Sequence, residues 1–301
     1  MNSNTLVTGG SGFIGSHMVA ALAKMPGSTI VTYDMQAPNN HAQNTISVNG
    51  DVFDRDKLVK VIRDNDVQKI IHMVGLGSVP ECKKSPDLSY RLNLSSVHSV
   101  LEAMRLSGAD RLVFPSTAVV YGGVKERKVN EKTQPRPTTV YGCHKLAAES
   151  LINGYTDTYG LKPTIFRIFN VYGDLEKEQG VVSIFIRKAL AGQPIIINGG
   201  KQLRDFVHLD DVISAFTGSL NSTKAYGKTM NIGSGIGITI KEVAMMVKQV
   251  FPNITITQQK PTSKDHSYRA DISRIRRLLK LDPVNPRKGI PRFIKECQTA
   301  R

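Results

Sequence analysis

The stretch Thr5-Leu-Val-Thr-Gly-Gly-Ser-Gly-Phe-Ile-Gly15 joins a short apolar run to three closely spaced glycines. The apolar run, residues 5–8, is predicted to be a buried strand. Apolar residues recur at helical spacing over residues 14–25, and Pro26-Gly27 ends this pattern. A strand, a glycine turn and a helix in this order are typical of a dinucleotide-binding loop.

Each of the three glycines has a separate role in such a loop. Gly9 permits the tight turn, and Gly12 lets the backbone come close to a pyrophosphate. Gly15 lets the helix pack on the strand, and the start of the helix directs its positive dipole at the phosphates. The glycine pattern alone is weak, so a dinucleotide site also needs support from the next strand of the chain.

The next predicted strand, residues 28–33, ends in Asp34, which lies 19 residues after Gly15. A carboxylate at this position can accept hydrogen bonds from an adenosine ribose and would repel a 2′-phosphate. Met35 and Gln36 follow, with no arginine beside them to bind a 2′-phosphate. The spacing therefore predicts NAD rather than NADP as the cofactor, and disfavours the alternative that Asp34 is only a turn residue.

Strands and helices alternate through the first half of the chain. After a loop at residues 38–41, strands are predicted at 45–48, 67–72 and 111–114, and helices at 54–64 and 97–106. This alternation predicts an α/β fold, a Rossmann-type doubly wound parallel sheet. Ligands of such sheets bind at the carboxyl ends of the strands. Besides the glycine loop and Asp34, the residues expected there are Asp51, Val74, Gly75, Ser116 and Thr117.

Composition excludes several classes of protein. With 301 residues, 40% hydrophobic and 22% charged, the chain is long enough for a large domain and a smaller one. Cys82, Cys143 and Cys297 are too few and too scattered for a disulfide framework or a metal site. No bound metal is expected. A reducing, cytoplasmic setting is expected, because the few cysteines show no disulfide pattern. No signal peptide and no apolar run long enough to span a membrane are predicted.

The formal net charge of +15 needs an explanation, because basic proteins often bind nucleic acid or other polyanions. The densest basic stretch is residues 274–292, where apolar residues alternate with Lys and Arg at helical spacing. This pattern favours a solvated helix face over a nucleic-acid interface. Nucleic-acid binding remains the less favoured alternative.

Tyr141 and Lys145 lie four residues apart and share one face of a predicted helix. A lysine cation beside a phenol favours the phenolate, so the pKa of Tyr141 is expected to fall until the side chain can act as a base near neutral pH. The alternative is an ordinary Tyr at an apolar edge with a solvated Lys. Cys143 and His144 point away from this face. Cys143 is expected to be inert, and His144 is expected to lie at a helix–helix contact.

Several motifs occur in the order found in one enzyme family. They are Thr8-Gly-Gly-Ser-Gly-Phe-Ile-Gly15, Gly50-Asp-Val52, His72-Met-Val-Gly-Leu76, Ser116-Thr-Ala-Val-Val-Tyr-Gly122, Tyr141-x-x-x-Lys145, Arg167-Ile-Phe-Asn-Val-Tyr-Gly173 and Arg204-Asp-Phe-Val-His-Leu-Asp-Asp211. Over residues 4–280 the chain resembles the extended short-chain dehydrogenases/reductases. Within them it is similar to the NAD-dependent nucleotide-sugar epimerase/dehydratase group, and most of all to its UDP-glucose 4-epimerase members.

The resemblance implies a set of catalytic and cofactor-binding residues. Tyr141 would be the base, Lys145 its cationic partner, and Thr117 a hydroxyl that binds the sugar and steadies its proton. NAD would oxidise the sugar at C4, and an epimerase would return the hydride to the other face of the resulting 4-keto sugar. The residues implied to bind NAD are Gly9, Gly12, Phe13, Ile14, Gly15, Asp34, Asp51, Val52, Val74, Gly75, Asn93, Tyr141 and Lys145.

Ala118-Val119, directly after Thr117, bears on which reaction follows the oxidation. In the resembled family the 4,6-dehydratases carry Asp-Glu at this position, and the sugar-acid decarboxylases usually have a Glu nearby. Alanine and valine cannot transfer protons. The resemblance therefore favours an epimerase over both.

The resemblance also implies a set of substrate-binding residues. Arg204 would pair with the diphosphate, or alternatively lie at the surface paired with Asp205. Tyr268 falls where a bulky residue limits the space for an N-acetyl group, which favours UDP-glucose and UDP-galactose over their N-acetylated forms. The chain departs from the family pattern at Gly77 and in lacking a clear second phosphate-binding arginine. The implied substrate contacts are Ser116, Thr117, Asn170, Val181, Val182, Arg204, Tyr268 and Arg269.

The expected organisation is an NAD-binding domain over residues 1–173, which also receives part of 203–235, and a mainly substrate-binding domain over 174–301. The expected function is 4-epimerisation of a UDP-sugar. Alternatives are another nucleotide-sugar enzyme of the same group (an N-acetylhexosamine or uronate epimerase, a reductase or a decarboxylase) or a non-catalytic, RNA-binding protein on the same fold. A homodimer is expected through the helices at 94–106 and around Tyr141, using Val97, Val100, Leu101, Leu146, Leu151 and Ile152.

Overall fold

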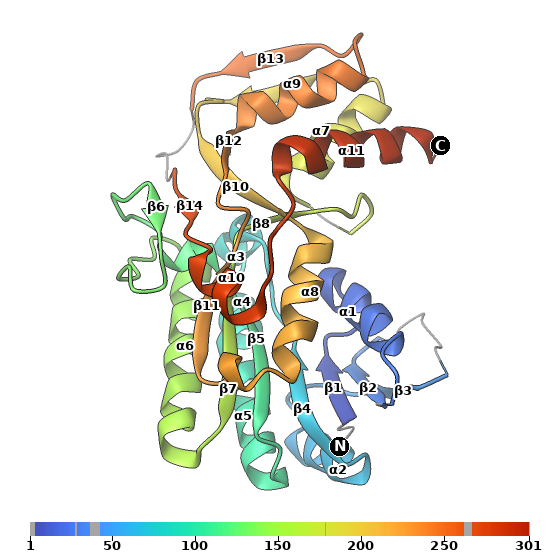
Figure 1. Cartoon of the computed structure of the whole chain (residues 1–301), viewed down its shortest axis with the longest axis vertical. Coiled ribbons are helices and arrows are strands. Elements are labelled where there is room, and N and C mark those ends of the chain that lie inside the picture. The colour runs from blue at the N-terminus through green and yellow to red at the C-terminus, as the bar shows by residue number, and fades with distance from the viewer. Residues whose placement is uncertain (1–3, 28, 37–42, 178, 262–266, 301) are drawn as a thin grey trace. The chain divides into compact units, whose positions relative to one another are not determined.

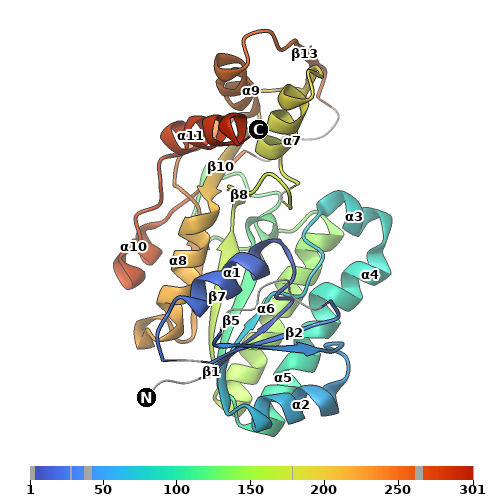
Figure 2. The same cartoon turned by 90° about the vertical axis from the view of Figure 1, so that its right-hand side faces the viewer.

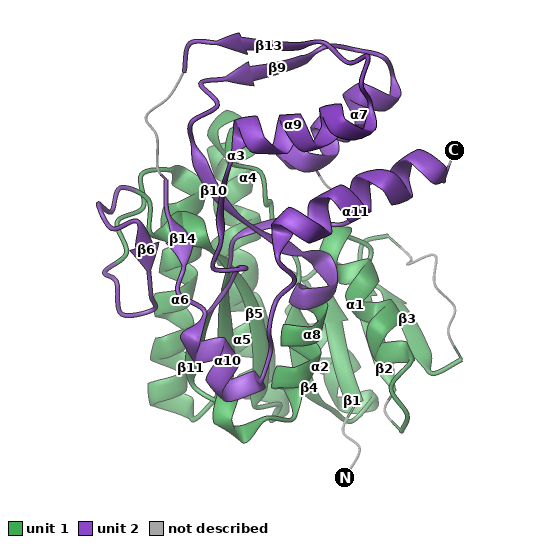
Figure 3. Cartoon of the chain, turned by 45° about the horizontal axis from the view of Figure 1, so that its top comes forward, with its two compact units in different colours: residues 1–122, 135–167, 213–230 green, residues 123–134, 168–212, 231–301 purple. Residues whose placement is uncertain are grey.

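A computed structural model describes residues 4–27, 29–36, 43–177, 179–261 and 267–300. The predicted loop at 38–41 and the first residue of the predicted strand 28–33 lie outside these ranges. The described chain divides into two compact units, coloured separately in Figure 3. Unit 1 comprises residues 1–122, 135–167 and 213–230, and unit 2 comprises residues 123–134, 168–212 and 231–301.

Helices and strands alternate along much of the chain. The strands are β1 Asn4–Thr8, β2 Ile30–Asp34, β3 Thr45–Asn49, β4 Val67–His72, β5 Arg111–Thr117, β6 Lys128–Val129, β7 Lys162–Ile168, β8 Asn170–Tyr172, β9 Ile195–Asn198, β10 Leu203–His208, β11 Lys228–Ile232, β12 Gly237–Thr239, β13 Ile256–Gln259 and β14 Arg269–Ala270. The α-helices are α1 Phe13–Ala23, α2 Arg55–Asp64, α3 Val79–Lys84, α4 Pro86–Tyr90, α5 Ser96–Ser107, α6 Val140–Tyr159, α7 Val181–Leu190, α8 Leu209–Leu220, α9 Ile240–Val250, α10 Ser273–Leu279 and α11 Pro286–Thr299. Shorter turns are the π-helical η1 Arg91–Ser95 and the 3-10 turns η2 Ala118–Val120 and η3 Thr223–Ala225.

Unit 1 is organised around a seven-stranded sheet with the order β11-β7-β5-β4-β1-β2-β3. The pairs β1–β2, β1–β4, β2–β3 and β4–β5 are all parallel. Strand order reverses on either side of β1, so the first βα loop opens at a topological switch point. The predicted α/β doubly wound parallel sheet is confirmed.

Helices cover both faces of this sheet (Figures 1 and 2). One layer contains α2, α5 and α6, and the other contains α1 together with the unit 1 part of α8. Buried side chains such as Leu6, Ile70, Leu101 and Phe114 fill the core between the sheet and the first layer. Burying both faces explains why the strands are near-continuous apolar runs.

Helix α6 begins and ends at residues suited to those positions. The Thr139 hydroxyl caps its start by accepting a hydrogen bond from the Gly142 amide at 3.1 Å. Gly160 ends it in the left-handed conformation, with φ of 73°. The cap places Tyr141 in the first turn, facing the protein interior.

Unit 2 contains three small sheets and its own core. Strand β10 pairs in parallel with β8 and antiparallel with β12, while β13 pairs with β9 and β14 with β6. Helices α7, α9 and α11 pack around an apolar cluster that includes Ile195, Phe206 and Val243. Unit 2 therefore has a hydrophobic core that is separate from the core of unit 1.

The boundaries of the two units differ from the predicted boundary at residue 173. Residues 168–173 lie in unit 2 because β8 pairs with β10. Residues 213–230, which lie within the range 203–235 that was expected to return in part, belong to unit 1, and β11 joins the large sheet. The second unit also takes residues 123–134, since β6 pairs with β14. Short pairings such as these leave no periodic pattern in the sequence.

The predicted apolar dimer face is wrong for most of its residues. Val97, Val100, Leu101 and Ile152 are at most 1% exposed and belong to the core of unit 1. Their helical spacing reflects packing within the unit, so it gives no support to an interface between copies. None of the helices in the described residues is long and apolar enough to cross a membrane.

Candidate active site

The glycine loop after β1 is shaped by close backbone contacts. Gly9 has φ of +71°, and a Cβ there would lie 2.7 Å from the Val74 amide nitrogen. A Cβ on Gly15 would lie 2.1 Å from the Gly9 carbonyl oxygen, so only glycine lets α1 start this close to the turn. A Cβ on Gly12 would make only an ordinary contact of 3.4 Å within the protein. Gly12 thus leaves space at the start of α1, where an anion would bind.

Asp34 lies beside this loop at the end of β2. Its carboxylate accepts hydrogen bonds from the amides of Ser11 and Gln36, both at 3.0 Å. Asp51 accepts from the Phe53 amide at 3.0 Å, and its other oxygen is 3.8 Å from the Arg91 guanidinium. Both carboxylates are therefore held in fixed orientations at the ends of β2 and β3, and their contact with a nucleotide stays a prediction.

Asn93 lies in the π-helical turn η1 and is completely buried. Its side chain accepts a hydrogen bond from the Leu76 amide and donates one to the Leu76 carbonyl, both at 3.1 Å. The Asn93 oxygen would lie 2.9 Å from a Cβ on Gly75, and Lys145 Nζ would lie 3.6 Å from it. Asn93 thus fixes the segment after β4, next to Lys145. Single π-helical turns occur frequently at functional sites.

Thr117 and Tyr141 meet where β5 ends and α6 begins. Both are less than 9% exposed, and their side chains are hydrogen-bonded to each other. Burial raises the pKa of Tyr141 to about 12, and the hydrogen bond from Thr117 only partly opposes this. The expectation that Tyr141 has a lowered pKa is therefore wrong for the chain by itself, because desolvation outweighs the favourable contacts.

Lys145 is buried on the same face of α6. Its Nζ donates to the Pro115 carbonyl at 2.9 Å and lies 4.6 Å from the centre of the Phe114 ring. Burial lowers the pKa of Lys145 to about 8, while Cys82 and Glu149 act to raise it. A buried lysine whose pKa is lowered to about 8, on the same helix face as a buried phenol, is typical of a functional site rather than a solvated helix face.

Two residues near this group were missed by the sequence reasoning. The Cys82 thiol is fully buried, donates to the Leu76 carbonyl at 3.4 Å and acts electrostatically on both Tyr141 and Lys145. Glu149 accepts a hydrogen bond from the Ser116 hydroxyl, so the predicted substrate contact Ser116 is engaged within unit 1. Only the spacing of Glu149, four residues after Lys145, could have indicated it.

The neighbours of Tyr141 along α6 lie as predicted. Cys143 is exposed. His144 has its Nδ1 3.0 Å from the Ser89 hydroxyl, at a contact between helices α6 and α4, and burial lowers its pKa. Neither side chain takes part in the Thr117–Tyr141–Lys145 group.

Unit 2 contains the other predicted substrate residues. Asn170 donates to the Asp205 carbonyl at 2.9 Å, and Arg204 donates to the Leu203 carbonyl at 2.9 Å. The Tyr268 ring meets Phe169 edge-on at 6.2 Å, and Arg269 donates to the Gly235 carbonyl at 2.8 Å. At the start of α7, Val182 is buried while Val181 is partly exposed. Their roles toward a substrate remain predictions.

Asp205 holds together the segments that carry several of these residues. It is fully buried, and its carboxylate accepts hydrogen bonds from the amides of Ser234, Gly235 and Ala270 at 2.7–3.0 Å. The alternative in which Arg204 pairs with Asp205 at the surface is therefore wrong. Asp205 instead ties the end of β11 and strand β14 to β10, because a buried carboxylate needs several donors.

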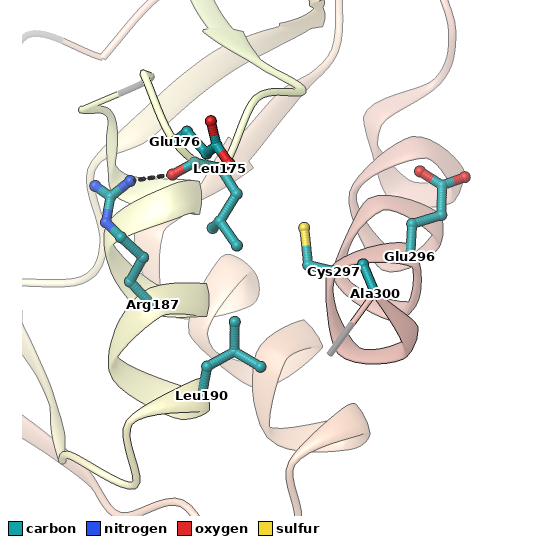
Figure 4. A pocket seen from close by; sticks show the side chains of 7 residues that line it. All are labelled: Leu175, Glu176, Arg187, Leu190, Glu296, Cys297 and Ala300. Carbon is teal, nitrogen blue, oxygen red and sulfur yellow. Dashed lines mark hydrogen bonds between the residues drawn. The ribbon is translucent and has the colours of Figure 1, made fainter.

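A separate cavity of about 720 Å³ lies in unit 2 (Figure 4). Its lining comes from α7, α11 and the loop before α7, and the side chains of Leu175, Leu190 and Cys297 point toward its centre. It includes none of the predicted site residues. In the part of the chain that the structure describes, no group of His, Cys, Asp and Glu is arranged to bind a metal.

Comparisons with known proteins find relatives of this chain in one family. The family model described as "NAD dependent epimerase/dehydratase family" matches residues 5–233. A UDP-glucose 4-epimerase of Azospirillum brasilense is 32% identical over 266 residues, covering 81% of this chain and 76% of that protein.

Solved structures of nucleotide-sugar epimerases also resemble this chain. The Thermotoga maritima UDP-glucose 4-epimerase, in a structure with UDP-glucose, is 27% identical, with a TM-score of 0.90 over 99% of each chain. The Methanobrevibacter ruminantium UDP-N-acetylglucosamine 4-epimerase, in complex with UDP-N-acetylmuramic acid, is 26% identical, with a TM-score of 0.89 over 99% of each chain.

Proposed function

The chain belongs to the NAD-dependent epimerase/dehydratase family, and we propose that it is a 4-epimerase of UDP-linked hexoses, of the UDP-glucose/UDP-galactose type. The observation that carries the proposal is the buried group of Thr117, Tyr141 and Lys145 at the ends of β5 and α6. A protein that only binds RNA has no need of a buried phenol beside a buried ammonium group, whose desolvation is costly.

The residues around the glycine loop fit NAD. The space at Gly12 and the start of α1 would hold the pyrophosphate, and the fixed carboxylate of Asp34 would accept hydrogen bonds from the adenosine ribose. Val74 and Gly75 would lie along the cofactor, where Asn93 holds the backbone. When bound, NAD supplies the hydride acceptor and, in its nicotinamide ring, a positive charge near Tyr141.

Tyr141 would take the proton from the sugar 4-hydroxyl as the C4–H bond is oxidised. With a pKa of about 12 in the chain alone, the phenol needs positive charge nearby to ionise at neutral pH. The protonated form of Lys145, one helical turn further along α6, would provide part of that charge. Thr117 would orient the sugar hydroxyl and donate to the phenolate. Return of the hydride to C4 on the opposite face of the 4-keto sugar, and of the proton from Tyr141 to the 4-oxygen, would complete the epimerisation.

Ala118 and Val119 favour epimerisation over elimination of water. They form the turn η2 directly after Thr117, where the Thr117 hydroxyl accepts a hydrogen bond from the Val119 amide at 3.2 Å. Neither side chain can transfer a proton, so this turn offers no acid or base to a 4-keto sugar.

The side chains proposed to contact the substrate diphosphate and nucleotide lie in unit 2. Arg204 would bind the diphosphate through its guanidinium fork, with Asn170 beside it and Val181 and Val182 against the nucleotide. Tyr268, whose ring is positioned by Phe169, would limit the space at the sugar and favour hexoses without an N-acetyl group. We propose that the protein acts as a homodimer, as the resemblance implied.

The test is turnover of purified protein on UDP-glucose, UDP-galactose and their N-acetylated counterparts, with the products separated by chromatography. We expect interconversion of UDP-glucose and UDP-galactose with no net consumption of NAD. GDP- and dTDP-glucose serve as controls for the nucleotide. Net release of water or carbon dioxide, or conversion of N-acetylated sugars alone, would contradict the assignment.

A further inference from the structure

The end of strand β5 is held by helix α6 at successive residues. Lys145 Nζ binds the Pro115 carbonyl at 2.9 Å, and the hydroxyl of Thr117 is hydrogen-bonded to Tyr141. Between these two contacts on the strand lies Ser116. Residues 141, 145 and 149 recur at one-turn spacing and share the buried face of α6.

The third contact is made by Glu149. Its Oε1 accepts a hydrogen bond from the Ser116 hydroxyl. The same carboxylate accepts two hydrogen bonds from the Arg167 guanidinium, with Nη2–Oε2 at 2.7 Å and Nε–Oε1 at 3.1 Å. Arg167 also donates to the Tyr121 hydroxyl at 3.2 Å. Ser116, Glu149, Arg167 and Tyr121 are all at most 6% exposed.

A buried ion pair is a poor way to stabilise a fold, because the desolvation of both charges offsets much of their attraction. This pair instead fixes orientation. The fork of Arg167 locks the rotamer of Glu149, and Glu149 locks the hydroxyl next to Thr117 in the strand. The negative charge of Glu149 also raises the pKa of Lys145, against the lowering effect of burial.

We propose that Glu149 is a positioning residue of the active site: held by Arg167, it fixes the end of β5 through Ser116, so that the Thr117 hydroxyl stays at Tyr141. The inference rests on the proposed function, in which Thr117 and Tyr141 both touch the substrate. It assigns Ser116 to the alignment of the strand rather than to the sugar.

Ser116→Ala is the most direct test, because it cuts the link to β5 and leaves the Glu149–Arg167 pair intact. We expect kcat to fall at least about tenfold, since small misplacements of reacting groups are costly. KM should stay within about threefold and NAD should remain bound. Ser219→Ala is the matched control: it removes another buried hydroxyl of unit 1, one that donates to the Phe216 carbonyl at 2.8 Å, and should leave kcat unchanged.

Glu149→Gln, alone and combined with Ser116→Ala, extends the test. At a pH well below 8, where Lys145 stays protonated, both residues act on the strand end through one hydrogen bond. The double variant should then lose no more than about twofold beyond the worse single variant. Independent losses that multiply would overturn the proposal. So would a Ser116→Ala protein with an unchanged kcat and a raised KM, which is the result expected if Ser116 binds the sugar.

Crystal structures of the same variants give a readout that does not depend on turnover. In Ser116→Ala we expect the contact between Lys145 Nζ and the Pro115 carbonyl to lengthen and Thr117 to move away from Tyr141. An unchanged strand end would overturn the proposal. A wild-type protein that converts no UDP-hexose would refute the proposed function instead, and the crystal structures would then decide on Glu149 alone.

Discussion

At the scale of the residue, the proposed role of Tyr141 as a base depends on the bound cofactor. The chain alone gives its phenol a pKa of about 12, because burial is the largest influence on it. A positive charge placed beside a phenol stabilises the ionised form and so lowers its pKa. Binding of NAD should therefore move the titration of Tyr141 toward neutral pH.

This shift can be measured from the absorbance of phenolate, as the difference between wild type and Tyr141→Phe across pH. Without NAD we expect the difference to emerge only near pH 12, and with NAD at clearly lower pH. Tyr141→Phe should also lower kcat by at least about 100-fold while leaving NAD bound, since it removes the base and little else. Full activity of this variant would refute the assignment of the base.

Gly12 and Gly15 lie three residues apart but should respond differently to alanine. Gly12 has extended backbone dihedrals, and a Cβ there meets nothing closer than 3.4 Å, so Gly12→Ala should fold normally. The added methyl should nevertheless occupy the space for the pyrophosphate and weaken NAD binding by at least about tenfold, or about 1.4 kcal/mol.

Gly15→Ala places its Cβ 2.1 Å from the Gly9 carbonyl oxygen, which forces the loop or α1 to move. It should lower the free energy of unfolding by about 1–3 kcal/mol even without NAD. Thermal unfolding of the NAD-free proteins and calorimetric titration with NAD separate the two effects. Equal stability of the two variants would show that the loop is not as tightly packed as its geometry indicates.

At the scale of the element, Arg111 joins strand β5 to the end of helix α8. It is 2% exposed, and its guanidinium donates to the Ser219 carbonyl at 2.8 Å, the Lys162 carbonyl at 2.6 Å and the Thr164 hydroxyl at 2.7 Å. Burial lowers the pKa of Arg111 to about 10, so it remains charged at neutral pH. A cation is favourable there, since the last carbonyls of a helix carry partial negative charge.

Replacing Arg111 by methionine keeps the apolar stem and removes all of these donors. We expect a loss of about 2–4 kcal/mol in the free energy of unfolding, because several buried acceptors lose their partner at once. Lys162→Met is the control, since its half-exposed ammonium pairs with Asp110 at the surface and should contribute at most about 1 kcal/mol. Denaturant unfolding of both variants provides the comparison, and equal losses would contradict this role of Arg111.

The elements that the sequence predicted well are those with strong local patterns. The glycine loop, Asp34 and the pair Tyr141 and Lys145 could be placed because turn geometry and helical spacing are local properties. The strand end that carries Thr117 could be placed for the same reason.

The Glu149–Arg167 pair and the burial of Cys82 near Tyr141 and Lys145 could not be predicted, since they depend on which elements pack together. The pairing of β6 with β14 was missed for a further reason: each strand has only two residues, too few for any period to appear. The raised pKa of Tyr141 also depends on burial, which spacing along a helix does not reveal.

At the scale of the whole molecule, the proposed epimerase function does not account for the formal net charge of +15. In unit 2, four arginines of the densest basic stretch, residues 274–292, form ion pairs with carboxylates. Guanidinium groups pair there with acidic groups at 2.6–3.5 Å. The pairs are Arg274–Glu131, Arg276–Asp282, Arg287–Glu242 and Arg292–Glu296. Each carboxylate offsets a positive charge nearby and so reduces the local attraction for a phosphate backbone.

We therefore expect only weak, sequence-independent binding of short single-stranded RNA, with a Kd of about 10 μM or weaker at physiological salt. Fluorescence anisotropy at several salt concentrations measures both the affinity and its dependence on salt. The charge reversals Arg277→Glu and Lys280→Glu, in and directly after α10, should change this weak binding little and leave turnover of UDP-glucose unaffected. Submicromolar binding that falls steeply with salt and is lost in these variants would instead support an RNA-binding role for the basic surface. Such a role would be compatible with catalysis only if RNA and UDP-glucose bind without competing, which the same anisotropy signal in the presence of UDP-glucose would reveal.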